Sequence, residues 1–509
     1  MALTRREFTV MAAAAAATQA FATRGVAKTA GGAAPDLTSL SLTEAAAQVR
    51  SGAVTATQLT EACLARIAIY DPKLDAFITV AKEKALARAR QLDADQKAGT
   101  VRGPLHGVPV AIKDIIDTAD IRTTGGSALF EDRVPATDAT VVARLVAAGA
   151  IVIGKTNTQE FAMGGGETSF FGPARNPWNL AHNTGGSSSG SGAAIAACLS
   201  FGALGTDTGG SVRMPASYCG IVGLKPTYGL VPIRGIFPLT LSLDHCGPMT
   251  RTVADNALML SVMAGYDKLD ITSVEHAKED YVAALGQPIS GFRLGAPVGY
   301  FDDVHPEVAS AVQAATEVLA KLTAGIKEVN LPGITHLGNL GSLGETFAFH
   351  EEYFKSAAGK YMLPERRRLE GIAKAEPKAV DYIRAKWDLE LLRRKIDDAF
   401  NDFDLVVLPT QRILPPPLDE LIKRAHDPQA RDPLVTSNCQ PFDVFGIPAI
   451  SIPCGFSKSG LPIGLMIAGP RFSEGKVLAL AQAYERATEW HARKPPITPA
   501  TPVPPVVSG

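Results

Sequence analysis

The sequence has no cluster of cysteines, no excess of charge of either sign and no apolar run long enough to span a membrane. Its six cysteines stand far apart without a CxxC pair, so neither a zinc knuckle nor a disulfide framework is indicated. Lys and Arg number 50 against 51 Asp and Glu, which leaves no basic excess to hold nucleic acid. The chain of 509 residues is 46% hydrophobic, enough for a large core in a soluble globular protein.

The first residues have the pattern of an export signal. Arg5 and Arg6 precede a short Ala-rich apolar stretch, and Ala20-Phe-Ala22 is a small-x-small cleavage site. With Phe8, the paired arginines resemble a twin-arginine signal. We therefore predict a signal peptide over residues 1–22, cleaved after residue 22 or 27, a periplasmic or secreted location, and no membrane contact after its removal. The alternative is an ordinary basic N-terminus followed by a disordered Ala-rich arm.

Alternating helix and strand patterns predict an α/β fold. Residues 138–148 have the apolar spacing of an amphipathic helix, which Gly149 ends, and the apolar strand 150–153 follows directly. Further buried strands are expected at residues 405–408, 449–452 and 463–467, the last two joined by a hairpin turn. This alternation is typical of a sheet covered by helices.

No change of composition divides residues 36–490, so we predict one continuous domain there. Its catalytic core is expected at about 60–270, and a more charged helical cover at about 300–400. Residues 493–509 are rich in proline, which lacks a backbone donor, and are expected to form an extended tail.

Glycine and serine are concentrated between residues 101 and 255. The two richest runs are Thr184–Gly192, which reads TGGSSSGSG, and Gly205–Pro215, which reads GTDTGGSVRMP. Glycines at this density let the backbone approach a reacting group and turn its N–H donors inward. A serine among them becomes a nucleophile once a base takes its proton.

Three short motif matches and the histidines have simpler explanations. Residues 149–156 match the phosphate loop GxxxxGK[ST], but the four variable positions are apolar and predict a strand. Residues 186–190 match GxSxG without the preceding strand that a nucleophile elbow needs, and 473–476 match SxxK where Ser473 better caps a helix. His182 and His245, nearest the Gly- and Ser-rich runs, are interpreted as structural, and no group of residues has metal-ligand spacing.

The Gly- and Ser-rich runs closely resemble the amidase signature family. The resemblance rests on residues 185–194, 205–213 and 219–229, with further matching stretches at 107–114, 154–157, 247–253 and 446–453. These stretches occur in the expected order and extend from about residue 40 to 490. The resemblance implies a single α/β domain with a mixed, largely parallel β-sheet covered by helices on both faces. It also implies no cofactor and no metal.

The resemblance also implies a catalytic set. Matched position by position, Ser211 is the nucleophile, Ser187 the bridging serine and Lys113 the base. The family implies a cis Gly186–Ser187 peptide and an oxyanion hole made by the backbone amides of Thr208, Gly209, Gly210 and Ser211. The supporting pair Asp207 and Arg213 is expected to hold this loop, because buried charges need partners. A small departure is Ser189, where many relatives carry Gly.

A lysine acts as a base only when it is neutral, and its reference pKa is ~10.4. The apolar run 108–112 before Lys113 favours burial, which lowers a lysine pKa. Adjacent strand residues face opposite sides, so Asp114 is expected to point away from Lys113. Phe161, Met163, Phe237 and Leu239 are candidates for lining the substrate site, although as core residues they would look the same in the sequence.

The sequence thus favours an exported amidase that hydrolyses a non-peptide carboxamide to an acid and ammonia or amine, with side activity on esters or carbamates. Its partner would be a small-molecule amide, and the chain would be a monomer or homodimer. The alternative is the glutamine-hydrolysing subunit of a cytoplasmic tRNA-dependent amidotransferase, which residues 154–255 also resemble. Against it stand the export signal and the absence, near Thr436, of the acid that this subunit uses to hold the ammonium of glutamine. A catalytically dead binding protein is a third interpretation, disfavoured by the intact triad.

Overall fold

The structure is a computed structural model that describes residues 36–164, 168–427 and 437–505. From Leu37 onward these residues form one unit. The export signal predicted over residues 1–22 lies outside the described residues.

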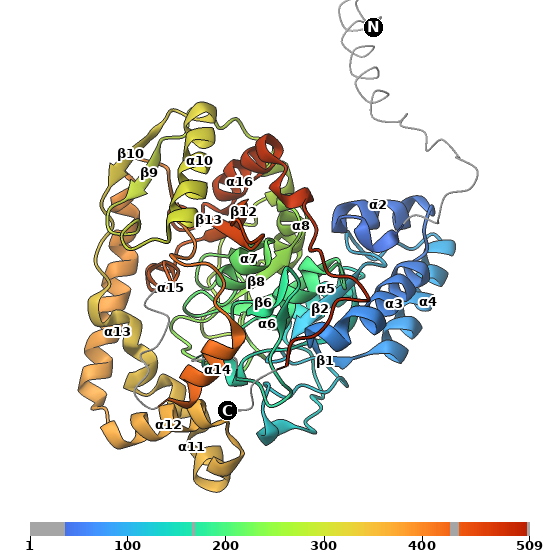
Figure 1. Ribbon diagram of the computed structural model, residues 1–509, viewed down its shortest axis with the longest axis horizontal. Helices are drawn as coiled ribbons and strands as arrows, with labels where there is room; N and C mark the ends of the chain where they lie inside the picture. The colour runs from blue at the N-terminus through green and yellow to red at the C-terminus, as the bar shows by residue number, and fades with distance from the viewer. Residues whose placement is uncertain (1–35, 165–167, 428–436, 506–509) are drawn as a thin grey trace, which may run out of the picture. The chain divides into compact units, whose positions relative to one another are not determined.

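A mixed sheet of 11 strands runs through this unit (Figure 1). Its strand order is β1-β3-β2-β6-β8-β7-β12-β13-β11-β9-β10. The strands are β1 (Phe77–Val80), β2 (Pro109–Lys113), β3 (Ile151–Thr156), β6 (Gly202–Asp207), β7 (Val222–Lys225), β8 (His245–Thr250), β9 (Leu294–Pro297), β10 (Ile326–Val329), β11 (Leu405–Pro409), β12 (Ala449–Phe456) and β13 (Pro462–Ala468). Parallel pairing joins β2 to β3 and β6, and β9 to β10 and β11, while the other neighbours pair antiparallel. The predicted α/β class with a mixed sheet is confirmed.

Helices cover both faces of the sheet, as predicted. The described helices are α2 (Leu42–Ser51), α3 (Ala56–Leu74), α4 (Lys82–Lys97), α5 (Thr140–Ala147), α6 (Ser189–Ala196), α7 (Arg213–Cys219), α8 (Val253–Met263), α9 (Tyr281–Ala284), α10 (Pro306–Leu322), α11 (Glu345–Ala357), α12 (Leu363–Ala375), α13 (Ala379–Lys395), α14 (Leu418–His426), α15 (Gln440–Phe445) and α16 (Glu474–Thr488). Helices α6 and α7 pack together on one face, and α8, α10 and α16 pack on the other. The central strands are therefore buried on both sides, which explains their unbroken apolar runs.

The helical cover is smaller than the sequence suggested. Helices α11, α12 and α13 form it, and they lie together at the lower left of Figure 1. The first part of the predicted cover, residues 300–329, instead contributes β10, which extends the sheet beside β9, and α10, which packs on the sheet. The charged side chains of α10 and β10 lie on the exposed side of the helix and on the edge strand of the sheet, and they do not indicate a separate helical layer.

The predicted hairpin near the C-terminal end is confirmed. Strands β12 and β13 pair antiparallel, and Ser457 N–H donates to the carbonyl of Leu461 across the turn at 2.8 Å. Gly460 in this turn has φ +81°, a backbone conformation that glycine adopts without steric cost.

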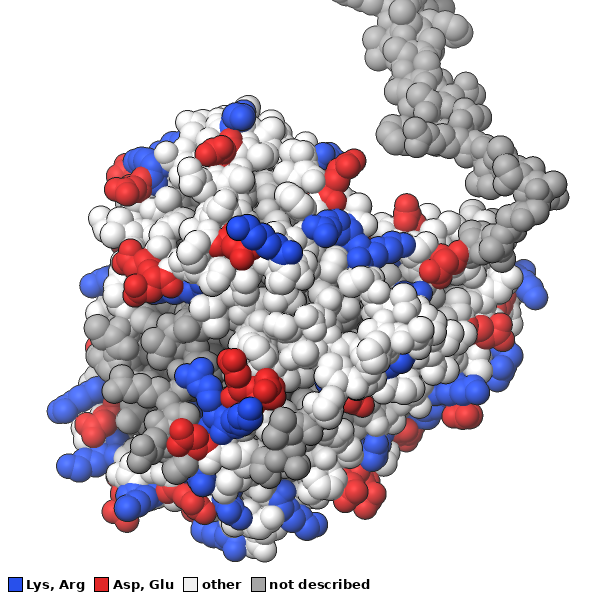
Figure 2. Space-filling view, in the orientation of Figure 1, with Lys and Arg blue, Asp and Glu red and all other residues white. Residues whose placement is uncertain are grey.

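Positive and negative side chains alternate on the face shown in Figure 2, and neither sign gathers into a patch there. Among the described helices none is both long and apolar enough to cross a bilayer.

Close packing around α6 generates a test of the fold. A Cβ added at Gly190 would lie 2.3 Å from the carbonyl oxygen of Ala76 and 2.4 Å from the amide nitrogen of Asn157. Gly190→Ala should therefore lower the free energy of unfolding by about 1–3 kcal/mol, because backbone atoms cannot yield to a methyl group. The measurement is a chemical denaturation midpoint.

The matched control is Gly371→Ala. Gly371 lies in the exposed part of α12, and a Cβ there meets no atom within 4 Å. Alanine favours a helix over glycine by ~0.5–1 kcal/mol, so this variant should be as stable as the parent or more stable. Equal effects of the two substitutions would contradict the packing around α6.

Candidate active site

Lys113 stands at the end of β2 with its amine in the interior. Its side chain is 0% exposed, and its Nζ donates to Ser187 Oγ at 2.8 Å and to Thr206 Oγ1 at 2.8 Å. The base and the bridging serine that the sequence places 74 residues apart are therefore in direct contact.

Burial lowers the pKa of Lys113 to about 7, against the weaker opposing effect of Asp207, Cys246 and Asp244. A large fraction of the amine is thus neutral near neutral pH, as the apolar run before it predicted. Asp114 does not oppose this shift, since its Oδ2 accepts from the amide and the hydroxyl of Thr124, on the other side of the strand.

The bridging serine lies in a tight loop ahead of α6. The Gly186–Ser187 peptide is cis, as the family resemblance implies, and Ser187 is 1% exposed. The next residue, Ser188, connects this loop to two other segments. Its amide donates to the carbonyl of Ser211 at 3.3 Å, and its Oγ accepts from the amide of Thr206 in β6 at 3.2 Å. The loop thus connects the nucleophile's segment to the strand beside Lys113.

Asp207 organises the loop that carries Ser211. Its carboxylate accepts from the backbone amides of Gly210, Val212 and Arg213 at 2.6, 3.1 and 3.3 Å. The guanidinium of Arg213 also donates to both carboxylate oxygens, from Nη2 at 2.9 Å and from Nε at 3.0 Å. Asp207 and Arg213 therefore hold the loop, as expected of buried charges that need partners.

The same contacts correct the predicted oxyanion hole. Because the Gly210 amide donates to Asp207, it is already used and does not belong with the free donors. The described residues supply no acceptor for the amides of Thr208, Gly209 and Ser211, which are also the partly exposed residues of this loop. Three donors, not four, are free to meet an oxyanion.

Two acids that the sequence analysis missed support this loop. Asp443 in α15 accepts from Arg213 Nη2 at 2.7 Å. Burial and the charge of Asp207 raise the pKa of Asp443 well above its usual value, so Asp207 carries the charge that pairs with Arg213. Asp244 accepts from Thr208 Oγ1 at 2.6 Å. Asp443 lies 230 residues from Arg213 along the chain, and no local spacing signals this contact.

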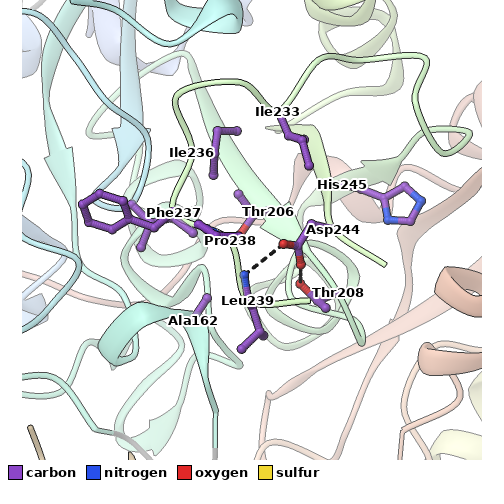
Figure 3. A pocket seen from close by; sticks show the side chains of 11 residues that line it. Ala162, Thr206, Thr208, Ile233, Ile236, Phe237, Pro238, Leu239, Asp244 and His245 are labelled. Atoms are coloured by element: carbon purple, nitrogen blue, oxygen red, sulfur yellow. Dashed lines mark hydrogen bonds between the residues drawn. The ribbon is translucent and has the colours of Figure 1, made fainter. Parts of the chain in front are cut away.

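A small cavity opens beside these residues (Figure 3). Thr206 and Thr208 form part of its wall, and Asp244 bridges Thr208 to the amide of Leu239 at 2.9 Å. The remaining wall is largely apolar and includes Ile115, Ala162, Ile233, Ile236, Phe237, Pro238, Leu239 and His245. The cavity measures only about 10 Å³, room for about one water molecule, so as it stands it does not hold an acyl group.

Of the four predicted lining residues, the cavity brings together only Phe237 and Leu239. Phe161 is fully buried in an aromatic cluster, with its ring centroid 5.6 Å from that of Phe130 and 5.7 Å from that of Tyr361. Met163 is also buried and does not line this cavity. The sequence could not separate these cases, because wall and core positions are equally apolar.

His245 and the phosphate-loop match serve structure, but the predicted cap at Ser473 is wrong: its side chain makes no capping bond to α16, and its Oγ donates to the carbonyl of Pro470 at 2.6 Å. His245 is buried, its Nδ1 lies 2.6 Å from the carbonyl of Leu243, and its Nε2 lies 3.2 Å from Lys225 Nζ. Lys155 of the phosphate-loop match is inside β3, as the strand interpretation predicted. In the described ranges no three His, Cys, Asp or Glu side chains are placed to hold a metal ion.

Comparison with known proteins shows the family of this chain. The family model described as Amidase matches residues 58–478. The chain is 41% identical over 483 residues to the A subunit of glutamyl-tRNA(Gln) amidotransferase from Roseiflexus sp. (strain RS-1), an alignment that covers 90% of this chain and 98% of that protein. The corresponding protein of Geobacter sp. (strain M21) is 39% identical over 488 residues, with 90% and 99% covered.

Solved structures are similar over a comparable length. A 6-aminohexanoate cyclic dimer hydrolase complexed with substrate aligns with a TM-score of 0.82 and 28% identity, over 91% of this chain and 99% of that one. The native peptide amidase from Stenotrophomonas maltophilia aligns with a TM-score of 0.78 and 33% identity, over 90% and 98%.

These relatives correct the main functional prediction. An exported amidase is not what the curated relatives at about 40% identity represent, and they favour the alternative that the sequence analysis kept open. The error came from giving more weight to the first 22 residues than to similarity along the whole chain.

The buried charge pair generates a stability test. Asp207→Asn should lower the free energy of unfolding by about 1–3 kcal/mol, because the loop amides and Arg213 lose their charged acceptor and Asp443 can replace only the contact with Arg213. The control is Asp419→Asn, which breaks an exposed pair with Lys423 at 3.3 Å and should cost at most about 0.5 kcal/mol. Chemical denaturation of both variants measures the difference, and similar losses would contradict the role of Asp207.

Proposed function

This chain belongs to the Amidase family, whose members are hydrolases that act on amide C–N bonds, and we propose that it is the glutamine-hydrolysing subunit of a tRNA-dependent amidotransferase. In this role it releases ammonia from the side-chain amide of glutamine, for transfer to glutamyl-tRNA(Gln). The observation that carries the proposal is 41% identity to the A subunit of a glutamyl-tRNA(Gln) amidotransferase, along 98% of that protein's length.

Amide cleavage is assigned to Lys113, Ser187 and Ser211. Neutral Lys113 takes the proton of Ser187 Oγ, which in turn takes the proton of Ser211 Oγ. The Ser211 oxygen then bonds to the amide carbon. The 2.8 Å contact between Lys113 Nζ and Ser187 Oγ and the burial of both side chains support this route.

The negative oxygen formed in that step is assigned to the amides of Thr208, Gly209 and Ser211. Removing a single donor of this kind typically costs about 2.7–4 kcal/mol of transition-state stabilisation. The proton on Lys113 returns through Ser187 to the leaving nitrogen, and the C–N bond breaks to release ammonia. Water then enters and hydrolyses the ester on Ser211 by the reverse relay, which restores all three side chains.

Glutamine hydrolysis with and without partner subunits tests the role. Ammonia release by the purified chain should rise at least about tenfold when the remaining amidotransferase subunits are added, since partner binding completes such a site. Ser211→Ala in the same complex is the control and should release none. Full turnover of an anilide or an aliphatic amide by the chain alone, with no effect of the subunits, would overturn the proposal.

Cell fractionation adds a second test. The periplasmic location predicted from residues 1–22 stays a prediction, and a chain exported completely would never meet charged tRNA. The role therefore requires a cytoplasmic pool of this chain, and a wholly periplasmic one would exclude it.

The position near Thr436, where such a subunit has the acid that holds glutamine, lies outside the described residues.

The pH dependence of Ser211 labelling on the acid side, the acid limb of its pH profile, should follow the protonation of Lys113. Its pKa of about 7 means that the amine is mostly protonated below pH 7 and mostly neutral above it. The labelling rate of Ser211 by a fluorophosphonate should therefore decrease about tenfold per pH unit below pH 7 and level off above it. Lys113→Ala should label at least about a hundredfold more slowly, without this limb. An unchanged limb in that variant would remove lysine from the mechanism.

A further inference from the structure

Lys113 has a second hydroxyl partner besides the bridging serine. Thr206 Oγ1 accepts from Lys113 Nζ at 2.8 Å, the same distance as that to Ser187 Oγ. Thr206 is 4% exposed and belongs to β6, the strand that pairs in parallel with β2 beneath the lysine. The amine is thus held between two buried hydroxyl groups.

The backbone of Thr206 is itself fixed to the loop of the bridging serine. Its amide donates to Ser188 Oγ at 3.2 Å, and its carbonyl accepts from the same hydroxyl at 3.3 Å. On its other side, Thr206 lies opposite Cys246 in the antiparallel pair with β8. The position of Thr206 Oγ1 relative to Ser187 is therefore set by two neighbouring elements.

A neutral amine has two N–H donors and one lone pair, and it is a base only toward a proton that the lone pair faces. If an N–H points at Ser187, the lone pair faces elsewhere and proton transfer fails. An acceptor at Thr206 takes one N–H and so restricts rotation of the amine. The equal distances of 2.8 Å allow one N–H to point at Thr206 and the lone pair at Ser187, and this is the arrangement that the proton relay requires.

We infer that Thr206 is a positioning residue that orients the lone pair of Lys113 toward the Ser187 hydroxyl. The inference deepens the proposed function and rests on its proton relay. When the Ser187 proton moves to Lys113, the resulting ammonium donates to Thr206 Oγ1 and back to Ser187 Oγ. No other bond forms or breaks at Thr206.

The same acceptor stabilises the ammonium more than the amine, because hydrogen bonds from a charged donor are stronger. The charged and titratable groups that act on Lys113 are Asp207 of β6, Cys246 of β8 and Asp244, which precedes β8. Each is present in a Thr206 variant, so a change in the pH profile of that variant reports the lost hydroxyl.

The experiment measures fluorophosphonate labelling of Ser211 from pH 5 to 9 in Thr206→Val, Thr206→Ala and Thr206→Ser. Both variants without the hydroxyl should label about tenfold to hundredfold more slowly on the plateau, since the base is misoriented. Their acid limb should move to lower pH. Thr206→Ser keeps the hydroxyl and should stay within about threefold of the parent, with the limb in place.

Thr250→Val is the matched control, since Thr250 is a buried threonine of β8 whose Oγ1 donates to the carbonyl of Thr252 instead. It should lose stability and keep the parent's labelling rate and pH profile. Normal plateau rates in Thr206→Val and Thr206→Ala would overturn the inference, as would a lowered rate with an unmoved limb. Labelling that persists in Ser211→Ala would instead refute Ser211 as the nucleophile of the proposed relay, and ammonia release that ignores the partner subunits would refute the proposed role, so these failures are distinct from that of Thr206.

Discussion

The contact between the Lys113 amine and the Ser187 hydroxyl depends on the absence of water around it. In water a lysine is almost wholly protonated at pH 7, and the contact would be a simple hydrogen bond from an ammonium. Here β2 carries the amine into the interior, between strands that are buried on both faces. Most of the sheet, with helices on each side, can be understood as what keeps this one amine out of solvent.

The nucleophile's loop obeys the opposite constraint, since it must stay partly open to substrate. An exposed glycine-rich loop is poorly ordered unless something fixes it, and Asp207 does so with three backbone amides and Arg213. The contact that orders the loop also uses the Gly210 amide. Of the four backbone amides of residues 208–211, one donates to Asp207 and holds the loop, and the other three, which have no acceptor among the described residues, remain free for an oxyanion.

How much was predictable follows from the range of the interactions. The hairpin of β12 and β13 and the strand β3 depend on neighbours in sequence, so apolar patterns and turn residues were enough to find them. The contact of Lys113 with Ser187 was expected only through a family resemblance, because periodicity carries no information about which strand ends meet. Asp443 was missed, because its partner Arg213 lies 230 residues away in the sequence. Only Phe237 and Leu239 of the four predicted lining residues line the cavity, because apolar wall and core positions look alike in the sequence.

The division between motif and scaffold also explains why the functional prediction failed in one respect and not in another. The Gly- and Ser-rich runs supply the two serines and the free amides, and Lys113 of β2 supplies the amine. That chemistry is common to an amidase and to a glutamine-hydrolysing subunit. These shared residues therefore do not separate the two. Identity of 41% over 90% of this chain takes in the residues around them, whereas a motif does not. In this chain the short motifs therefore point to the reaction, and similarity along the whole chain points to the role.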